Sequence, residues 1–333
     1  MNPKVSVIIP AYNTEKYISQ AIESALTQTE QSVEVIVVND ASTDATLEVV
    51  KSFSDERLTL INNEYNRGAG YARNRAIQES RGEWVAVLDS DDWYAPERLE
   101  KLLQVAYKED ADLIADDLYC IQDGEKSPWS TWFRESGEQI EKIRPINTVY
   151  FVETNMHDGQ GRLQLGITKP LFKRDFLIQH GIEYDETIKV AQDYWFVLRC
   201  LVNDARFVLV PEPYYFYRSR EGSLVKGSQL ARLNEDCRAT LDFLQQELVK
   251  NDSKLVRALS INFAALERNR TYYRVVESLK HGALLAALIE MVYNPYFFIH
   301  FIRKLPKIMK RRVDYYILGN KYAYDIFYPR SKL

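Results

Sequence analysis

Hydrophobic and polar residues alternate in a regular order over the first third of the chain. The pattern predicts buried strands at the short apolar runs Val5–Ile9, Val33–Val38, Leu58–Ile61, Trp84–Leu88 and Leu113–Ala115. Between these runs, apolar residues recur at helical spacing, which predicts helices over 15–26, 45–53, 69–80 and from Pro96 onward. Strands that alternate with helices indicate a mostly parallel sheet covered on both faces. The pattern therefore predicts an α/β fold over residues 4–116.

The alternation weakens after residue 116. Residues 120–165 are polar and irregular, and Trp129, Trp132 and Phe133 lie there in a loop-like context. A short strand is expected within 166–174, a helix at Asp193–Val202 and a strand at Phe207–Val210. From Ser228 the sequence is helical in character. We therefore expect one domain over 1–227, made of the halves 1–116 and 117–227, and a helical C-terminal region over 228–333.

The composition narrows the class of protein. The chain has 333 residues, of which 46% are hydrophobic, so it can bury a core. Its formal net charge of −4 argues against a nucleic-acid-binding protein. The three cysteines, Cys120, Cys200 and Cys237, are not spaced as metal ligands. Their small, odd number predicts a reducing, cytoplasmic compartment. We expect no signal peptide, since a strand begins almost at Met1. We also expect no transmembrane helix, because the sequence has no run of eighteen apolar residues.

Polar clusters follow four of the predicted elements. They lie at Pro10–Asn13, Asn39–Asp44, Asn66–Asn74 and Asp89–Asp92. Ligands bind beyond the carboxyl ends of the strands in open α/β sheets, so these clusters are expected to meet at one edge. Helix capping is the alternative reading, but it accounts for at most one carboxylate of the acidic group in Asp89–Asp92.

The acidic group Asp89, Asp91 and Asp92 requires a partner, because adjacent carboxylates repel one another. Mg²⁺ or Mn²⁺ would relieve this repulsion, since both take oxygen ligands from one or two carboxylates and from substrate phosphates. A metal that holds a diphosphate suggests a nucleotide substrate. The sequence therefore predicts a divalent cation as the cofactor.

Taken in order, the four clusters resemble the successive motifs of family 2 inverting glycosyltransferases of the polysaccharide-biosynthesis type. The resemblance implies a GT-A fold, with a mostly parallel sheet flanked by helices and a helical C-terminal extension. It implies a nucleotide-sugar donor, most simply a UDP-sugar, and a saccharide or lipid-linked saccharide acceptor. Residues 1–116 would form the nucleotide-binding half and residues 117–227 the acceptor half.

The resemblance also assigns roles to residues of the nucleotide-binding half. Asp40 would accept a hydrogen bond from uracil, Arg73 would approach the base or the diphosphate, and Asp89 would bind the ribose. Asp91 and Asp92 would bind the metal. The remaining nucleotide-binding residues would be Pro10, Ala11 and Tyr12, which line the base pocket, together with Asn13, Asn66, Gly68, Ser90 and Arg218.

An inverting transfer needs a general base within reach of the acceptor hydroxyl. In the resembled family this base is an aspartate that opens a helix, and Asp193 matches it within the stretch "KVAQDYWFVLRC". Gln192 stands where the family usually has an acidic residue, so the role of this neighbour is open. The alternative for Asp193 is that it only caps the helix that follows.

Further candidates lie on either side of Asp193. Tyr217, Arg218 and Ser223 resemble a family segment that closes over the diphosphate, but this stretch lacks the histidine that some relatives use as a metal ligand. Arg218 or Arg220 could neutralise phosphate directly, unless this is a solvated charged loop. On the acceptor side, Lys169 could line the acceptor site or belong to a structural strand. Trp132 could stack on a sugar or belong to the core.

The C-terminal region combines apolar and basic residues. Residues 283–301 are rich in Leu, Ile, Tyr and Phe, interrupted by Glu290, Asn294 and Pro295, and a run of Lys and Arg follows. This combination is typical of an interfacial membrane anchor, which would place a cytoplasmic protein at the inner face of the membrane. The alternatives are helices packed on the catalytic domain or a homo-oligomer interface.

Two other enzyme classes fit the sequence less well. A sugar nucleotidyltransferase would need a Gly-rich loop with Arg and Lys after the first strand, where this chain has Pro10–Asn13. A dinucleotide oxidoreductase would need Gly-x-Gly-x-x-Gly at the same place. A non-catalytic subunit that binds sugar nucleotides stays open as an alternative.

Overall fold

The computed structural model describes residues 2–137, 140–155, 163–220, 229–294 and 296–313, together with Ile317. The chain divides into two compact units between Ser223 and Leu224. This division falls in the segment 221–228, outside the described residues, as does the boundary expected at 227. Of the described residues, those up to 220 form the first unit and those from 229 form the second.

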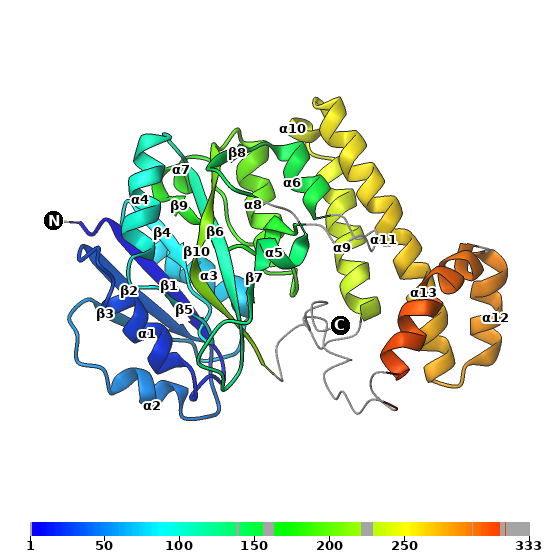
Figure 1. The fold of residues 1–333 in the computed structure, drawn as a ribbon, viewed down its shortest axis with the longest axis horizontal. Helices are drawn as coiled ribbons and strands as arrows, with labels where there is room; N and C mark the ends of the chain where they lie inside the picture. The colour runs from blue at the N-terminus through cyan, green and yellow to red at the C-terminus, as the bar shows by residue number, and fades with distance from the viewer. Residues whose placement is uncertain are drawn as a thin grey trace. The chain divides into compact units, whose positions relative to one another are not determined.

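A single sheet forms the centre of the first unit (Figure 1). Its strands follow the order β3-β2-β1-β4-β9-β6-β10-β5, while β7 pairs with β6 and β8 with β10. The bounds are β1 Val5–Ala11, β2 Val33–Asn39, β3 Leu58–Asn62, β4 Trp84–Val87, β5 Trp93–Tyr94, β6 Leu113–Gln122, β7 Ser130–Thr131, β8 Arg144–Ile146, β9 Leu171–Lys173 and β10 Phe207–Ser219.

Parallel pairs join the strands β1 to β4 of the sheet. Strand β1 pairs in parallel with β2 and β4, and β2 pairs in parallel with β3. Strand β9 lies antiparallel between β4 and β6, and β6 runs parallel to β10. This arrangement confirms the predicted α/β class. Strand β6 extends across the division expected at residues 116 and 117, so the two predicted halves share one continuous sheet.

Four helices alternate with the first strands: α1 Ile18–Leu26, α2 Thr46–Lys51, α3 Ala69–Glu79 and α4 Arg98–Lys108. Apolar side chains of α1, α2 and α4 pack with one face of β1 and β2 in the main core, and α3 packs on the same two strands. These strands are buried along nearly their whole length, which explains why most of their residues are apolar.

Two predicted helix starts differ from the structure. Helix α1 begins at Ile18 rather than at Glu15, because the Glu15 carboxylate accepts a hydrogen bond from the Ala45 N–H at 2.9 Å. Helix α4 begins at Arg98, so Pro96 precedes its first turn instead of lying within it. Both differences lie at the ends of elements, where side chains from other segments decide the boundary.

The segment between β6 and β10 is more ordered than its sequence suggested. It contains α5 Trp132–Ser136, α6 Thr148–Thr154, α7 Arg174–Gln179, α8 Gln192–Val202 and a 3₁₀ turn at Leu165–Ile167. The loop-like interpretation of Trp132 and Phe133 was wrong, since both open α5 and Phe133 is buried. The strand expected within 166–174 is confined to Leu171–Lys173.

The second unit is helical, as expected. Its helices are α9 Gln229–Leu244, α10 Glu247–Lys250, α11 Ser253–Lys280, α12 Leu284–Tyr293 and α13 Tyr296–Arg312. Small apolar clusters form its core: Leu233 with Cys237 and Leu266, and Tyr272 with Val275, Ala287 and Phe297. In the described part of the chain, no single helix is long and apolar enough to span a membrane. The segments Leu284–Tyr293 and Phe297–Arg303, bent by 99°, pass that test together by length and composition.

Candidate active site

The loops after β1 and β2 hold each other at the carboxyl edge of the sheet. Asn13 adopts a left-handed backbone with φ 52°. Its N–H donates to the Ser42 hydroxyl at 3.0 Å, and its side-chain oxygen accepts from the Thr43 N–H at 2.8 Å. In the same loop Ala11 is buried, whereas Tyr12 presents 47% of its surface to solvent. The structure therefore brings Pro10–Asn13 beside the second polar cluster, with the Tyr12 ring accessible to a ligand.

Asp40 anchors the loop that enters α3. Its buried carboxylate accepts hydrogen bonds from the Asn63 amide at 2.7 Å, the Gly68 N–H at 2.7 Å and the Arg67 N–H at 3.0 Å. A carboxylate can accept about four hydrogen bonds, so these three donors leave room for one more. Gly68 has φ 91°, which a residue with a side chain rarely adopts. Asn66 is exposed next to this anchor.

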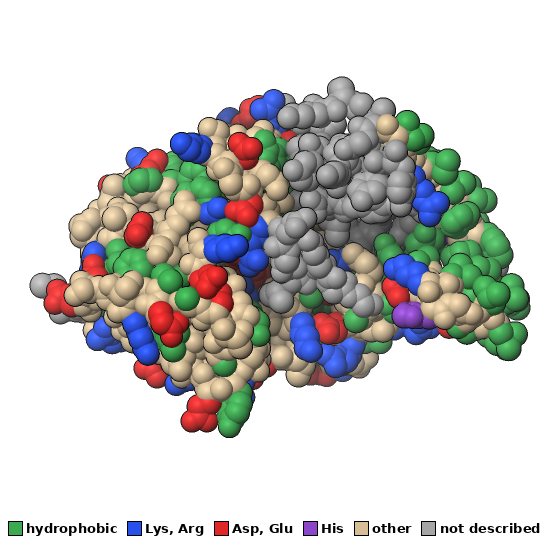
Figure 2. Space-filling view, turned by 90° about the horizontal axis from the view of Figure 1, so that it is seen from below, with side chains coloured by type: hydrophobic (Ala, Val, Ile, Leu, Met, Phe, Trp, Pro, Cys, Tyr) green, Lys and Arg blue, Asp and Glu red, His purple; other side chains and the backbone are tan. Residues whose placement is uncertain are grey.

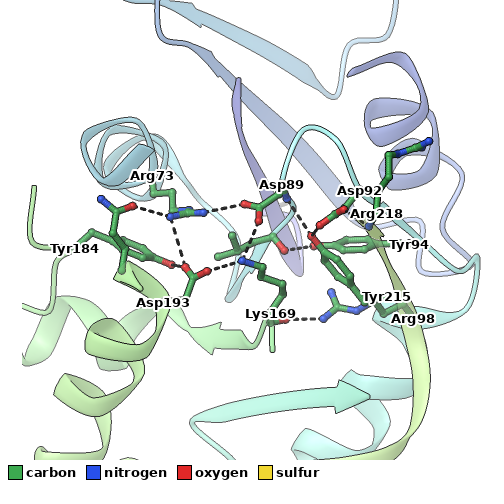
Figure 3. A network of polar contacts seen from close by, with 12 residues as sticks. Arg73, Asp89, Asp92, Tyr94, Arg98, Lys169, Tyr184, Asp193, Tyr215 and Arg218 are labelled. Carbon is green, nitrogen blue, oxygen red and sulfur yellow. Dashed lines mark hydrogen bonds and ion pairs between the residues drawn. The ribbon is translucent and has the colours of Figure 1, made fainter. Parts of the chain in front are cut away.

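A polar network begins at the end of β4 (Figure 3). The Asp89 carboxylate accepts from Arg73 Nη2 at 2.8 Å and pairs with Lys169 Nζ at 2.9 Å. Burial alone would raise the pKa of Asp89, but Lys169 and Arg73 outweigh it and hold that pKa well below its usual range. Arg73 is itself buried, so it lies inside this network rather than free to reach a ligand.

The same network contains Asp193, the second residue of α8. Its carboxylate binds the Lys169 ammonium, accepts from the Tyr184 hydroxyl at 3.3 Å and lies 3.5 Å from Arg73 Nη1. Ala191 is the N-cap of α8, and no side chain caps that end of the helix. The capping alternative for Asp193 is therefore wrong. The Asp193 side chain retains 15% of its exposure, so one side of it faces solvent.

Gln192 completes the contact between α8 and α3. Its side-chain oxygen accepts from Arg73 Nη1 at 3.0 Å, and its amide nitrogen donates to the Ile188 carbonyl. A Cβ atom on Gly70 of α3 would lie only 2.8 Å from that nitrogen, so the close approach requires glycine. Gln192 is thus a neutral hydrogen-bond acceptor that orients Arg73, and this is the structural role of the residue before Asp193.

Asp91 and Asp92 have different surroundings. Asp92 is buried, and its carboxylate accepts from the Tyr215 hydroxyl at 2.7 Å and from the Arg218 N–H at 2.8 Å. Burial, together with Asp91 and Asp89, raises the pKa of Asp92 well above its usual range. The Asp91 carboxylate is partly exposed and accepts from Arg220 Nε at 2.6 Å.

Two arginines of the β10 region lie beside these carboxylates. Arg218 donates from Nε to the Asp91 carbonyl at 2.7 Å, and its guanidinium lies 4.7 Å from the centre of the Trp93 ring and 4.9 Å from that of Tyr17. Arg220 also lies over Tyr17, at 5.2 Å. Both cations thus lie next to Asp91. Ser223, the other candidate of this stretch, lies outside the described residues.

The metal that the resemblance implies can be tested against these contacts. Asp91 fits a metal ligand, because its carboxylate is partly exposed and, among the described side chains, is held by an arginine that a cation could displace. Asp92 does not fit, since both of its oxygens accept hydrogen bonds from the protein interior. Among the described residues, no three His, Cys, Asp or Glu side chains are grouped to hold a metal ion. A divalent ion here would therefore rely on substrate phosphates for its other ligands.

The two acceptor-side candidates have separate positions. Lys169 is buried between Asp89 and Asp193, so the structure places it at the centre of the network. Trp132 packs against the main core and donates its indole N–H to the Leu163 carbonyl at 2.7 Å, which favours the core reading. Ser90 is buried at the end of β4.

Several residues of the network carried no signal in the sequence. Tyr215 joins its two parts, since its hydroxyl donates to Asp92 and accepts from the Asp89 N–H at 3.2 Å. Arg98 forms a fully buried ion pair with Asp116 at 2.8 Å and donates to the Lys169 carbonyl at 2.6 Å. These contacts join residues far apart in the sequence, so no local pattern announces them.

Comparison with known proteins agrees with this geometry. Residues 6–168 match the model of glycosyl transferase family 2. The chain is 31% identical over 310 residues to the succinoglycan biosynthesis protein ExoO of Rhizobium meliloti, covering 93% of this chain and 87% of that protein. It is 36% identical to ExoU of the same organism, over 71% of this chain and 69% of that protein.

A solved structure shows the same fold. The crystal structure of S. aureus TarS 1–349 in complex with UDP-GlcNAc superposes with a TM-score of 0.60 at 22% identity, over 86% of this chain and 89% of that chain. This similarity confirms the GT-A fold. The family motifs, the extended identity to two relatives and the shared fold lead to one conclusion: the chain belongs to glycosyltransferase family 2.

Proposed function

We propose that this family member is an inverting transferase that moves a sugar from a UDP-sugar to a hydroxyl of a saccharide or lipid-linked saccharide. The observation that carries the proposal is Asp193, a partly exposed carboxylate joined through Lys169 to Asp89. The relatives ExoO and ExoU are named for succinoglycan biosynthesis, and the TarS structure holds UDP-GlcNAc. These names favour a role in cell-surface polysaccharide or glycolipid synthesis.

The donor would lie across the carboxyl edge of the sheet. Pro10, Ala11 and the exposed Tyr12 would line the base, and the remaining acceptor capacity of Asp40 suits a single N–H of uracil. Asp89 would accept from the ribose. Arg218 and Arg220 would face the diphosphate, since both lie beside Asp91. Asn13, Asn66, Gly68 and Ser90, which match family positions, would shape the loops around the nucleotide.

The reaction would be a single displacement. The acceptor hydroxyl oxygen forms a bond to the anomeric carbon while the bond from that carbon to the diphosphate oxygen breaks. The bonding electron pair leaves with the nucleoside diphosphate, and the hydroxyl proton passes to the Asp193 carboxylate. Attack from the face opposite the leaving group inverts the anomeric configuration. Lys169 and Tyr184 would orient Asp193 toward the acceptor.

Asp91, with the donor diphosphate, would hold a divalent cation. Mn²⁺ or Mg²⁺ bound there would act as a Lewis acid on the leaving diphosphate. A mannosyltransferase of Pyrobaculum calidifontis with the same fold, at 17% identity and a TM-score of 0.56, was solved in complex with GDP-Man and Mn²⁺. Arg220, which binds Asp91 in the structure, would move to the phosphate when the ion is bound.

The Asp193→Asn variant tests the proposed base. We expect transfer from the best UDP-sugar of a panel to fall about 10²- to 10⁴-fold, because the amide cannot take the proton, while UDP affinity stays within about twofold. Asp175→Asn, an exposed carboxylate of α7, is the matched control. Nuclear magnetic resonance of the product would show the anomeric configuration. A retained configuration, or full activity of Asp193→Asn, would contradict the proposal.

The same assay decides between the remaining alternatives. A non-catalytic sugar-nucleotide-binding subunit would bind UDP but transfer no sugar with any acceptor. A nucleotidyltransferase role is disfavoured by family membership.

The cytoplasmic location stays a prediction. The three cysteines are free and buried in the structure.

A further inference from the structure

Helices α12 and α13 expose an unusual number of large apolar side chains. Leu285, Val292, Tyr293 and Ile302 present 73%, 77%, 81% and 65% of their surfaces to solvent. Figure 2 shows hydrophobic side chains gathered in green over this end of the second unit. Proteins that stay free in solution rarely expose contiguous apolar patches of this kind. The patch therefore calls for an occupant.

The exposed residues form stripes at helical spacing. In α13, Phe298, Ile302, Leu305 and Met309 are exposed and follow one another at intervals of four, three and four residues, so they share one face. Phe297 belongs to the inner face, where its ring stacks on Tyr272 at 5.7 Å between centroids. We define the apolar stripe as these four residues of α13 with the exposed residues of α12, namely Leu284, Leu285, Leu288, Ile289, Val292 and Tyr293.

The same helix carries a dense positive charge. Helix α13 contains six Lys and Arg residues and no Asp or Glu, in a chain whose net charge is −4. Arg303, Lys310 and Arg312 are exposed among the residues whose side chains are described. An apolar stripe next to clustered cations matches a bilayer that carries anionic headgroups above an apolar interior.

Charge also argues against a second copy of this chain as the occupant. A symmetric dimer places the same patch of each subunit against the other. Both copies of the basic helix α13 would then lie in one interface, and like charges gathered at an interface disfavour association. An anionic lipid surface satisfies both the apolar stripe and the cations without this repulsion.

We infer that α12 and α13 form a peripheral docking face for an anionic lipid bilayer, with the apolar stripe inserted at the headgroup level and the cations of α13 paired with lipid phosphates. The inference stands on the second unit alone and does not rest on the proposed reaction. It makes the protein membrane-bound through helices that lie in the interface plane.

Vesicle sedimentation with the full chain tests the inference. We expect at least about tenfold tighter binding to vesicles that contain phosphatidylglycerol than to pure phosphatidylcholine, with the difference reduced in high salt. Phe298→Ser with Ile302→Ser should remove most binding to both vesicles. Arg303→Gln with Lys310→Gln and Arg312→Gln should lower binding to anionic vesicles about tenfold or more and remove the preference.

Matched controls change the same chemistry elsewhere on the surface. Ile178→Ser with Leu248→Ser removes two exposed apolar residues, and Lys51→Gln with Lys101→Gln and Lys108→Gln removes three exposed cations. Both controls should bind vesicles as the wild type does. Circular dichroism and UDP binding show that each variant is folded. A variant that loses vesicle binding but keeps its UDP affinity tests the docking face alone, and a failure of the proposed transferase reaction would leave that result unchanged.

Two results would overturn the inference. One is that the wild type and the apolar-stripe variant (Phe298→Ser with Ile302→Ser) bind anionic vesicles equally well, or that the wild type binds no vesicles at all. The other is a wild-type dimer in light scattering that the apolar-stripe variant converts to monomer without a change in vesicle binding, which would make a second copy the occupant.

Discussion

Lys169 is the residue on which the geometry of the site depends most. Its ammonium joins Asp89, the proposed ribose ligand, to Asp193, the proposed base. Burial would lower the pKa of Lys169, but these two carboxylates outweigh it and raise the pKa, so the side chain stays charged. Its backbone is fixed as well, because its carbonyl accepts from the fully buried Arg98. We therefore propose that Lys169 is a positioning residue that acts through Asp193.

Replacement of Lys169 by Met should change the chemical step more than substrate binding. We expect kcat to fall about tenfold or more with a smaller change in the KM of the acceptor, because Asp193 loses the ammonium that orients it. Lys169→Arg should restore part of kcat, because it keeps the charge. Lys101→Met, on the surface of α4, is the control.

The alternative for Lys169 is direct contact with the acceptor. In that case Lys169→Met would raise the acceptor KM with little change in kcat. That result would return Lys169 to the acceptor site and leave Asp193 dependent on Tyr184 and Arg73 alone.

Asp91 and Asp92 should respond differently to metal. Calorimetry of UDP binding, with Mn²⁺ and with a chelator, should show that Asp91→Asn loses most of the affinity gained from Mn²⁺, because an amide is a weaker ligand. Asp92→Asn should keep that gain, since Asp92 is buried against Tyr215 and Arg218. Equal loss in both variants would show that Asp92 is a metal ligand after all.

At the scale of elements, β6 links the sheet to the irregular segment that follows it. Asp117 lies on this strand, and its carboxylate accepts from the Leu118 N–H at 2.7 Å and from the Phe133 N–H at 2.9 Å. Phe133 stands in the first turn of α5, so Asp117 anchors that helix to the sheet. Burial, against these hydrogen bonds, raises the pKa of Asp117 to about 6.

This raised pKa has a consequence for stability. The unfolded protein releases the Asp117 proton near pH 4 and the folded protein near pH 6, so ionisation of Asp117 lowers the free energy of unfolding as pH rises between those values. Asp117→Asn keeps an acceptor but cannot ionise. We expect its stability relative to wild type to increase by about 2 kcal/mol from pH 4.5 to 7.5, measured by urea unfolding.

The exposed Asp175 of α7 provides the control for this experiment. Asp175→Asn removes an exposed carboxylate in the same way, and its free energy of unfolding is measured at the same two pH values. A pH-independent difference for Asp117→Asn would mean that the Asp117 carboxylate titrates in the folded protein as it does in the unfolded chain.

At the scale of the whole molecule, each unit has its own apolar core. The first unit has a large apolar cluster on one face of its sheet, and the second has small clusters among its helices. Separate cores favour separate unfolding. We expect two transitions in differential scanning calorimetry, and UDP with Mn²⁺ at about a hundred times its Kd should stabilise only the first unit, by about 2.7 kcal/mol.

The same scan can contradict this expectation. A single transition whose midpoint temperature rises with UDP would mean that the two units unfold as one cooperative body. A UDP analogue without the diphosphate serves as the control ligand and should shift the transition less, because it cannot engage the cations beside Asp91.

The sequence alone determined the order of strands and helices over residues 4–116, apart from the two-residue strand β5, and the polar clusters at their ends. Both are local signals: apolar periodicity reports burial, and the end of a parallel strand is a fixed place in an α/β sheet. Asp193 came instead from the resemblance to family 2 glycosyltransferases, because its own neighbours also fit a residue that only caps a helix.

Only the tertiary structure decided how those residues are paired. Lys169 lies 80 positions from Asp89 and 24 from Asp193, and no local pattern shows that one ammonium binds both. The different surroundings of Asp91 and Asp92 likewise depend on Tyr215 and Arg218 from β10. Ion pairs and hydrogen bonds between distant segments form only when the sheet is assembled, which is why the sequence could name these residues but not their partners.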